Sequence, residues 1–317
     1  MPIRLPGNLP AANVLERENV FVMSDQQAQH QDIRPLKILL LNLMPKKIET
    51  EIHIIRMLSN TPLQVDLELM RIHDKPSKNT SIEHMETFYK DFDGVKNSKY
   101  DGMIITGAPL GAIPFEDVDF WAEMKTVMDW TKTHVTSTLY LCWAVQAAMH
   151  HFYGIDKRIM TKKVSGVYSH RLIKPLSPIV RGFDDVFNSP HSRYAELSMD
   201  ELNAHPDLEV ISDSEEVGAY LLARKDGREV FVIGHSEYEP QCLKDEYERD
   251  IAAGLNPSVP ENYFPNDDPG QQPIVTWKSH GNLLFSNWLN YYVYQLTPFD
   301  IDAIGREVLD VPIQLGG

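Results

Sequence analysis

The stretch TSTLYLCWAVQAAMHHFYG, residues 136–154, changes from an apolar run to helix-forming residues at Cys142. The run that ends at Leu141 is typical of a short buried strand, and the residues after it favour a helix. A strand that leads directly into a helix places Cys142 at the first helical turn, where backbone N–H groups and the helix dipole stabilise a thiolate. Free cysteines are often buried and inert. This stretch alone therefore leaves open whether Cys142 is a nucleophile or fills space in a core.

The same alternation of strand and helix patterns continues on both sides of this stretch. Strands are expected at 37–45, 63–70, 100–109 and 137–143, and helices at 48–60, 84–92 and 116–134. After residue 155 the expected strands are shorter, at 209–214, 219–225 and 229–235, and an aromatic helix over 286–296 closes the pattern. This order predicts an α/β fold with a mostly parallel central sheet flanked by helices. No linker-like break divides the middle of the chain, so we expect one domain.

The composition disfavours several classes of protein. The chain has 317 residues and a formal net charge of −15, which disfavours non-specific binding to nucleic acid or to anionic membranes. No apolar run approaches the roughly 20 residues that a membrane-spanning helix needs, and the N-terminus has no signal-peptide pattern. The two cysteines have neither disulfide nor metal-ligand spacing. We therefore expect a cytoplasmic protein without a metal or a cofactor, in which Cys242 is structural or incidental.

A histidine and a glutamate follow a second strand end. The segment EVFVIGHSEYE, residues 229–239, is a short apolar strand followed by His235, Ser236 and Glu237. Residues two apart in an extended chain point to the same side, so Glu237 could fix the tautomer of His235 and leave its other nitrogen to face a thiol. That is the nucleophile, base and acid order of a catalytic triad. An ordinary surface His-x-Glu is the alternative.

A glycine turn follows a third strand end. Gly107 and Gly111 in TGAPLG, residues 106–111, allow a close approach of the backbone to a ligand. The backbone N–H groups of Leu110 and Gly111, together with that of Trp143, are therefore candidate donors of an oxyanion hole. Reactive residues of open α/β sheets gather at the carboxyl ends of strands, where all three segments are expected to end. A plain strand-ending turn is the alternative for TGAPLG.

Several long motifs resemble the homoserine O-acyltransferase family, whose fold is flavodoxin-like and similar to class I glutamine amidotransferases. The motifs are TGAPLG, LYLCWAVQAA, SGVYSH, GFDDVFNSPHSRY, GHSEYE, DEYERD and WKSHGNLLFSNWLNYYVYQ. The resemblance extends from LPAANVLERENVFVM to about Pro298. We therefore expect an N-terminal arm over 1–35, a single α/β catalytic domain over 36–298 and a C-terminal tail over 299–317.

The resemblance implies a two-step acyl transfer. Cys142 would take an acyl group from an acyl-CoA and pass it to the hydroxyl of L-homoserine, with His235 as base and Glu237 as its orienting partner. Lys163, Ser192 and Arg249 match positions that the family uses to bind substrate, and Arg249 suits a carboxylate because it can donate two parallel hydrogen bonds. The resemblance also implies the first committed step of methionine biosynthesis and suggests a homodimer.

The residue after TGAPL is linked in this family to the choice of acyl donor. A glutamate there resembles the acetyl-CoA users, because a carboxylate would repel and crowd the far carboxylate of a succinyl group. Gly111 leaves room and carries no like charge, so we expect succinyl-CoA. Transfer from acetyl-CoA by the same mechanism is the alternative.

Two further functions use the same cysteine differently. A glutamine amidotransferase would use the same triad to release ammonia, but those enzymes usually surround the cysteine with glycines, whereas Trp143, Ala144 and Val145 follow it here. A thiol-based ligand sensor would need Cys142 without His235 and Glu237. Both are therefore less favoured than acyl transfer.

Overall fold

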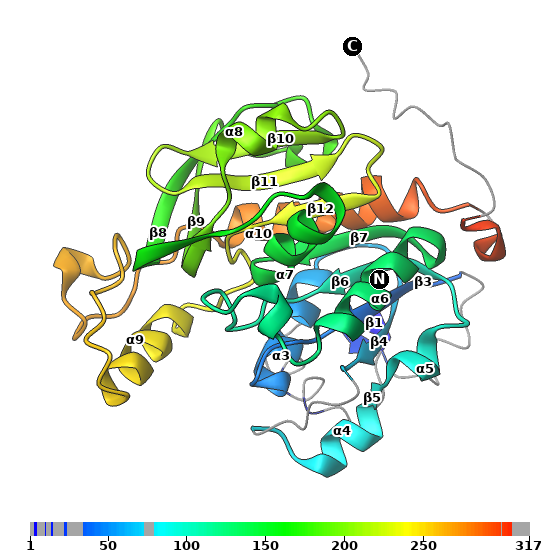
Figure 1. Ribbon diagram of the computed structural model, residues 1–317, viewed down its shortest axis with the longest axis horizontal. Helices are drawn as coiled ribbons and strands as arrows, with labels where there is room; N and C mark the ends of the chain where they lie inside the picture. Colours follow the sequence, from blue (N-terminus) through cyan, green and yellow to red (C-terminus); the bar gives the residue numbers. More distant parts are fainter. Residues whose placement is uncertain are drawn as a thin grey trace.

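The structure is a computed structural model that describes residues 3–4, 10, 14, 22–23, 34–72, 79–298 and 300–305. One large mixed sheet crosses the molecule, with helices packed on its faces (Figure 1). Its parallel part contains β3 (Leu36–Leu41), β4 (Val65–Met70), β6 (Tyr100–Ile105), β7 (Val135–Leu141) and β12 (Glu229–Val232). Three two-residue strands extend it, namely β1 (Ile3–Arg4), β2 (Val22–Met23) and β5 (Tyr89–Lys90).

The remaining strands are antiparallel. They are β8 (Arg158–Leu172), β9 (Val186–Glu196), β10 (Leu208–Ser214) and β11 (Gly218–Arg224). The order across the sheet is β2-β1-β4-β3-β6-β7-β12-β11-β10-β8-β9, and β5 pairs with β4. The prediction of a mostly parallel α/β sheet is confirmed for the strands from β2 to β12 in this order, and the sheet then continues as an antiparallel extension.

The two faces of the sheet bury separate hydrophobic clusters because successive residues of a strand point to opposite sides. Ile38 and Leu40 of β3 face one cluster, and Leu39 and Leu41 face the other. The first cluster packs against α3 (Lys47–Leu58), α10 (Lys278–Asn287) and the π-helix η5 (Trp288–Tyr294). The second packs against α6 (Trp121–His134) and α7 (Trp143–Ala148). Every residue of β6, β7 and β12 is therefore buried between the two helical layers.

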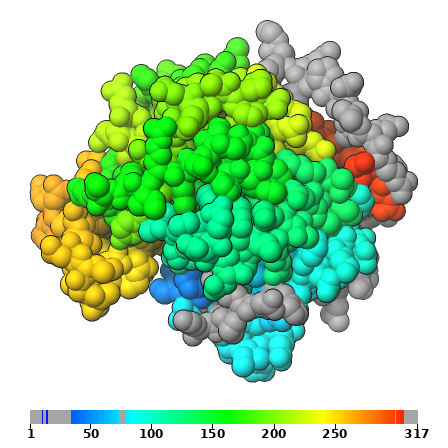
Figure 2. All heavy atoms as spheres, viewed as in Figure 1, coloured from blue at the N-terminus to red at the C-terminus, as the bar shows by residue number. Residues whose placement is uncertain are grey.

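The remaining helices complete the described fold. They are α4 (Ile82–Phe88), α5 (Phe92–Val95), α8 (Met199–Ala204), α9 (Cys242–Ala252) and the π-helix η2 (Met149–Tyr153). Single 3-10 turns are η1 (Phe115–Asp117), η3 (Pro178–Val180), η4 (Pro265–Asp267) and η6 (Ile301–Ala303). In Figure 2, α9 and the loop after it protrude at the left of the molecule. None of the helices in the described ranges is long and apolar enough to cross a membrane.

The predicted helix over 84–92 is interrupted, which corrects the sequence interpretation. The helix α4 ends at Phe88, and Tyr89 and Lys90 pair with β4 instead. The hydroxyl of Tyr89 donates to Glu51 Oε1 at 2.6 Å and accepts from Asn42 Nδ2 at 2.9 Å, inside the core. Those tertiary hydrogen bonds hold Tyr89 in extended backbone and override its local helical preference.

The hairpin of β8 and β9 was not predicted from the sequence, because its strands lack a regular alternation of buried and exposed residues. Its register pairs Ser165 with Ser192 and Gly166 with His191. The predicted strands over 209–214, 219–225 and 229–235 are confirmed as β10, β11 and β12, except that β12 ends at Val232. The aromatic helix over 286–296 is confirmed by α10 and η5.

Most of the predicted arm over 1–35 and most of the tail over 299–317 lie outside the described residues. Within the arm, β1 pairs in parallel with both β2 and β4, which extends the sheet at that edge. Within the tail, η6 is described, and Lys99 Nζ donates to the carbonyl oxygen of Ile304 at 2.7 Å.

Candidate active site

Three neighbouring strands end at one edge of the sheet and deliver the three predicted segments to one place. β7 lies between β6 and β12, and all three run parallel. Leu141, the last residue of β7, is paired with Val232, the last residue of β12. Cys142 follows the first and His235 comes three residues after the second, so the topology brings them together. The turn over 106–111 follows β6 beside them.

Cys142 has an unusual backbone conformation at the junction of β7 and α7. Its φ is 50° and its ψ is −110°, a positive φ that residues other than glycine rarely adopt. The Cys142 N–H donates to the carbonyl oxygen of Val232 at 2.8 Å, which ties this turn to β12. A Cβ at Gly107 would lie only 3.2 Å from Cys142 Cβ, so glycine permits the close approach of the neighbouring turn. The strained turn holds the thiol at the carboxyl end of β7.

His235 is fixed from three sides. Its Nδ1 lies 2.8 Å from Glu237 Oε1, and its backbone N–H donates to the carbonyl oxygen of Pro190 at 2.8 Å. The ring of Tyr238 stacks on the imidazole with centroids 4.1 Å apart. His235 and Glu237 are 4% and 9% exposed. With Nδ1 occupied by the carboxylate, the imidazole has Nε2 left for a second partner. The predicted pairing is present, but its expected cause is wrong, because residues 236 and 237 form a turn and do not continue the strand.

That second partner is the thiol of Cys142. A hydrogen bond and an electrostatic interaction link Cys142 to His235. Burial alone would lower the pKa of His235, but the charges of Cys142 and Glu237 and their hydrogen bonds outweigh burial and raise this pKa well above its ordinary value. An imidazolium is therefore stabilised between a sulfur and a carboxylate, which is the arrangement that activates a cysteine nucleophile.

The candidate oxyanion donors differ in their present state. Trp143 is the first residue of α7, so its N–H belongs to the group at a helix N-terminus that has no intrahelical acceptor. Leu110 N–H, by contrast, donates to the carbonyl oxygen of Ala108 at 2.8 Å and would have to release it before binding an oxyanion. Gly111 lines the cavity above Cys142.

The turn that carries Leu110 and Gly111 is held by a lysine that sequence reasoning missed. Lys157 Nζ donates to the carbonyl oxygens of Leu110 at 3.3 Å and Ile113 at 2.5 Å, and lies 4.3 Å from the ring centroid of Phe115. Burial lowers the pKa of Lys157 to about 8. No motif of the sequence marks this residue, because its partners are backbone atoms.

Two of the three predicted substrate residues contact a carboxylate that sequence reasoning also missed. Lys163 Nζ lies 2.9 Å from Glu246 Oε2, and the hydroxyl of Ser192 donates to the same oxygen. Tyr238 donates to Glu246 Oε1 at 2.8 Å. Burial would raise the pKa of Glu246, but Lys163 and the hydrogen bonds lower it below its ordinary value. The motif DEYERD contains Glu246, so the signal was present, but only the fold places it beside Lys163 and Ser192.

Arg249 lies one helical turn after Glu246 on α9, and its guanidinium donates to Asp250 Oδ1 from Nη2 at 2.7 Å and from Nε at 3.0 Å. Its side chain is 62% exposed. It is therefore the most accessible of the three predicted substrate residues, able to meet a ligand that enters from solvent.

The cavity that contains the Cys142 thiol is also lined by a buried cationic side chain, that of Arg193. Arg193, next to Ser192, donates from Nη1 to the carbonyl oxygen of Ala195 at 2.8 Å and from Nη2 to that of Val217. Burial lowers the pKa of Arg193, and the charge of Cys142 opposes that shift. Both residues line the same cavity. An arginine keeps its charge in such surroundings, so it adds a fixed positive charge near the sulfur. Sequence reasoning missed it within the motif PHSRY.

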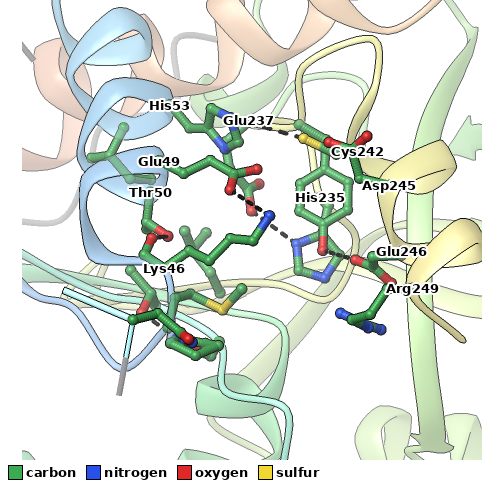
Figure 3. A pocket seen from close by; sticks show the side chains of 18 residues that line it. Lys46, Glu49, Thr50, His53, His235, Glu237, Cys242, Asp245, Glu246 and Arg249 are labelled. Carbon is green, nitrogen blue, oxygen red and sulfur yellow. Dashed lines mark hydrogen bonds and ion pairs between the residues drawn. The ribbon is translucent and has the colours of Figure 1, made fainter. Parts of the chain in front are cut away.

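Two adjoining cavities open on this cluster. One of about 280 Å³ contains Cys142, Trp143 and Gly111 on one side. Its other walls include Lys163, Ser192, Arg193, His235, Glu246 and Arg249. The second, of about 240 Å³, shares His235 with the first and is also lined by Glu237, Glu49, His53, Cys242 and Asp245 (Figure 3). The first cavity therefore joins the thiol, the imidazole, the glycine turn and the charged cluster in one space.

Comparisons with known proteins agree over nearly the whole chain. A family model described as homoserine O-succinyltransferase matches residues 2–299. A homoserine O-succinyltransferase from Tolumonas auensis is 58% identical over 307 residues, which cover 97% of this chain and 98% of that protein. One from Shewanella piezotolerans is 57% identical over 302 residues, 95% of this chain and 96% of that protein.

Solved structures support the fold. A glutamine amidotransferase from Thermotoga maritima has a TM-score of 0.52 at 11% sequence identity and covers 81% of this chain and 98% of its own. A glutamine amidotransferase from Methylobacillus flagellatus has a TM-score of 0.51 at 12% identity, covering 81% of this chain and 95% of its own. The predicted likeness to class I glutamine amidotransferases is therefore confirmed as a likeness of fold.

Proposed function

Because the chain belongs to the homoserine O-succinyltransferase family, we propose that it transfers a succinyl group from succinyl-CoA to the hydroxyl of L-homoserine through a thioester on Cys142. The single observation that supports this mechanism best is the thiol–imidazole–carboxylate line of Cys142, His235 and Glu237 at the floor of a cavity with charged walls. The proposal includes a cytoplasmic enzyme at the first committed step of methionine biosynthesis.

The first half of the reaction forms the acyl-enzyme. The thiolate of Cys142 attacks the thioester carbonyl of succinyl-CoA, and the oxyanion that develops is stabilised by backbone N–H groups at Trp143 and at the turn of Gly111. When the tetrahedral intermediate collapses, the carbon–sulfur bond to CoA breaks, and the proton on His235 passes to the leaving CoA thiolate. Exchange of one thioester for another is nearly isoenergetic, so the step needs no other energy source.

The second half transfers the succinyl group to an alcohol. Neutral His235 accepts the hydroxyl proton of homoserine, whose oxygen attacks the thioester carbonyl, and Cys142 leaves as a thiolate beside the restored imidazolium. Glu237 keeps Nδ1 of the imidazole protonated, so that Nε2 faces the reacting atoms throughout. Holding homoserine at a fixed position favours its hydroxyl over water through effective molarity.

The charged cluster on α9 and on the β8–β9 hairpin suits the two charged ends of homoserine. A carboxylate at Glu246 complements an α-ammonium group, and the exposed guanidinium of Arg249 can bind an α-carboxylate with two hydrogen bonds. Lys163 neutralises Glu246 when the site is empty, and Ser192 supplies a neutral donor at the same oxygen. Binding of homoserine would therefore exchange existing ion pairs for new ones.

The donor preference follows from the wall formed by Gly111. A Cβ added at Gly111 would meet only Tyr194, at 3.8 Å from its backbone N and 3.9 Å from its Cβ, so the wall beside the thiol is open. This room, with no carboxylate on the turn, supports succinyl-CoA over acetyl-CoA. The turn over 106–111 has no cationic side chain of its own. Positive charge comes instead from Arg193, which lines the cavity, and from Lys157, which binds the carbonyl oxygens of Leu110 and Ile113.

Mass spectrometry of the intact protein tests the proposal directly. After brief exposure to succinyl-CoA without homoserine, we expect one succinyl adduct on Cys142, which disappears when homoserine is added and yields O-succinylhomoserine. Cys142→Ser should give no thioester, and Cys242→Ser should give the normal adduct as a matched control. A higher kcat/KM for acetyl-CoA than for succinyl-CoA would show that acetyl-CoA is the donor. Release of ammonia from glutamine at a rate comparable to acyl transfer would show that the protein is a glutamine amidotransferase.

A further inference from the structure

A second cluster of reactive side chains lies between α3 and α9, apart from the thiol of Cys142. Glu49 and His53 are four residues apart on α3 and therefore lie on one face of that helix. Cys242 is the first residue of α9 and faces them. One ligand atom from each of the three residues lies within 4.8 Å of the others, and Figure 3 shows the three side chains directed toward one another.

The spacing suits a small metal ion. Cys242 Sγ lies 3.8 Å from His53 Nε2. A zinc ion at about 2.3 Å from sulfur and about 2.0–2.1 Å from nitrogen, with tetrahedral angles, separates the two ligand atoms by about 3.6 Å. The thiol and the imidazole therefore already have nearly the separation of two ligands on one ion. Glu49 offers a carboxylate oxygen within 4.8 Å of both atoms as the third ligand.

The surroundings admit an ion and offer a fourth ligand. Cys242, His53 and Glu49 line the cavity of about 240 Å³, and the carboxylate of Asp245 lines it too, one helical turn after Cys242. A thiolate and the carboxylate of Glu49 together balance the charge of a divalent ion. Lys46 Nζ, 3.0 Å from Glu49 Oε2, is the ammonium that such an ion would displace. Lys46 is well exposed, so this release is easy.

The same cavity reaches the triad. Glu237 lines it, and its Oε2 is buried without a hydrogen-bond partner among the described residues, while Oε1 holds His235. A cation at the cluster of Glu49, His53 and Cys242 would attract the Glu237 carboxylate, whose Oε2 makes no other hydrogen bond among the described residues. Occupancy would thereby weaken the hold of Glu237 on the imidazole.

We propose that Glu49, His53 and Cys242 form a binding site for a divalent transition metal of the zinc class, with Asp245 or a water molecule as the fourth ligand. Ion binding replaces the thiol proton of Cys242, which goes to solvent, and no redox step is involved. An occupied site slows turnover through Glu237. The binding itself is independent of the proposed acyl transfer, so each can fail without the other.

Cobalt(II) titration of the full-length Cys142→Ser protein tests the site, because this variant leaves Cys242 as the only thiol of the chain. We expect a near-ultraviolet sulfur-to-cobalt charge-transfer band that saturates at one ion per chain and is abolished by excess zinc. The band should vanish in the Cys142→Ser/Cys242→Ser protein. His53→Gln in the Cys142→Ser background should weaken cobalt binding by more than about tenfold. Even substitutions of residues that only hydrogen-bond to a metal ligand lower metal affinity by about that factor.

A matched control and a functional readout complete the experiment. His151, which is paired with Asp129 on another surface, provides His151→Gln as the control that should keep the band and its affinity. Zinc should inhibit turnover of the wild type and inhibit the Cys242→Ser protein at least about tenfold less strongly. A missing band in folded Cys142→Ser protein, or a band that survives Cys242→Ser, overturns the proposed site. Circular dichroism verifies that each variant is folded.

Discussion

The Nδ1 atom of His235 and the Oε1 atom of Glu237 are 2.8 Å apart at the end of β12, and both side chains are buried. This contact joins two residues of one turn, which is closed by a hydrogen bond from the Tyr238 N–H to the His235 carbonyl oxygen at 3.1 Å, so the local backbone sets the geometry. Burial of His235 opposes its protonation, and the charges of Cys142 and Glu237 reverse that effect. Glu237 therefore orients the imidazole of His235 and also favours its positively charged form beside the thiol.

Glu237→Gln should lower the pKa of His235, because it removes one of the two negative charges that raise it. The thiolate–imidazolium pair would then be lost at a lower pH than in the wild type. We expect kcat/KM to fall on the order of 10²–10⁴-fold, the usual contribution of a positioned base. The measurements are steady-state kinetics and the pH dependence of Cys142 alkylation.

Glu239→Gln is the matched control, because Glu239 lies two residues further along and pairs with Arg56 and Lys278 instead. It should leave the pH profile of alkylation unchanged. An unchanged profile in Glu237→Gln as well would show that the carboxylate does not tune His235.

The strained backbone at Cys142 leads to a stability prediction. A positive φ at a residue other than glycine costs about 1–3 kcal/mol, so Cys142→Gly should be more stable than Cys142→Ala by about 1 kcal/mol after the greater flexibility of glycine in the unfolded chain is deducted. Urea denaturation of the two inactive proteins measures the difference.

Ala147→Gly, five residues later, is the control at a position with ordinary helical backbone in α7. Glycine is unfavourable there, so this substitution should reduce stability by about 1 kcal/mol. If Cys142→Gly is instead the less stable of the two substitutions at its position, the junction of β7 and α7 stores no strain.

The meeting of Cys142, His235 and Glu237 could be predicted from the sequence because these residues follow strand ends. Strands that alternate with helices form a parallel sheet, and parallel strands end at one edge, so the residues after β7 and β12 had to meet. The positive φ of Cys142 was not predictable, since a cysteine there gives no sign of it. Glu246, Arg193 and Lys157 were missed for a related reason: as charged residues they resemble a solvated surface until the fold buries them.

The hairpin of β8 and β9 and the cluster on α3 and α9 show which contacts the sequence pattern does not predict. β8 and β9 have no clean periodicity, yet their pairing brings Lys163 and Ser192 to the site. The spacing of Glu49 and His53 is visible in the sequence, but Cys242 is 189 residues beyond His53 and meets them only through tertiary packing. The expectation that Cys242 is structural or incidental rested on the sequence alone, and sequence spacing does not report contacts between distant helices. Cys242 does pack in a hydrophobic cluster, and it also lies beside His53.

Gly111→Glu should shift donor preference from succinyl-CoA toward acetyl-CoA. The added side chain has room, since the nearest neighbours of its Cβ lie at 3.8–3.9 Å, so the protein should fold normally. A carboxylate there would repel the far carboxylate of a succinyl group, and one mispaired charge in a confined site costs several kcal/mol, roughly a hundredfold or more in relative kcat/KM. Kinetics with both donors measure the ratio.

Gly111→Gln separates repulsion from crowding, because glutamine has the size of glutamate without its charge. It should reduce the use of succinyl-CoA less than Gly111→Glu does. Equal effects of the two substitutions would assign donor choice to the volume of the wall alone.

Glu246→Gln should weaken both homoserine binding and the fold, in a way that pH can separate. The pKa of Glu246 is lowered from its ordinary value of 4.5, with burial opposed by Lys163 and by hydrogen bonds from Ser192 and Tyr238. A carboxylate of this kind stabilises the folded state fully above the unfolded pKa and loses that contribution as pH falls through the folded pKa. The variant should therefore be less stable at pH 7 by about 1–3 kcal/mol, and the difference should shrink as the pH is lowered below 4.5.

The kinetic readout assigns the role of Glu246 in the reaction. Acylation of Cys142 by succinyl-CoA should proceed at a normal rate in Glu246→Gln, whereas KM for homoserine should rise, because the α-ammonium group loses its counter-ion. Glu248, on the same helix and 61% exposed beside Lys244, supplies Glu248→Gln as a control that should change neither quantity. A normal KM for homoserine with slow acylation would move Glu246 from the acceptor site to the donor site, since only one half-reaction contains homoserine.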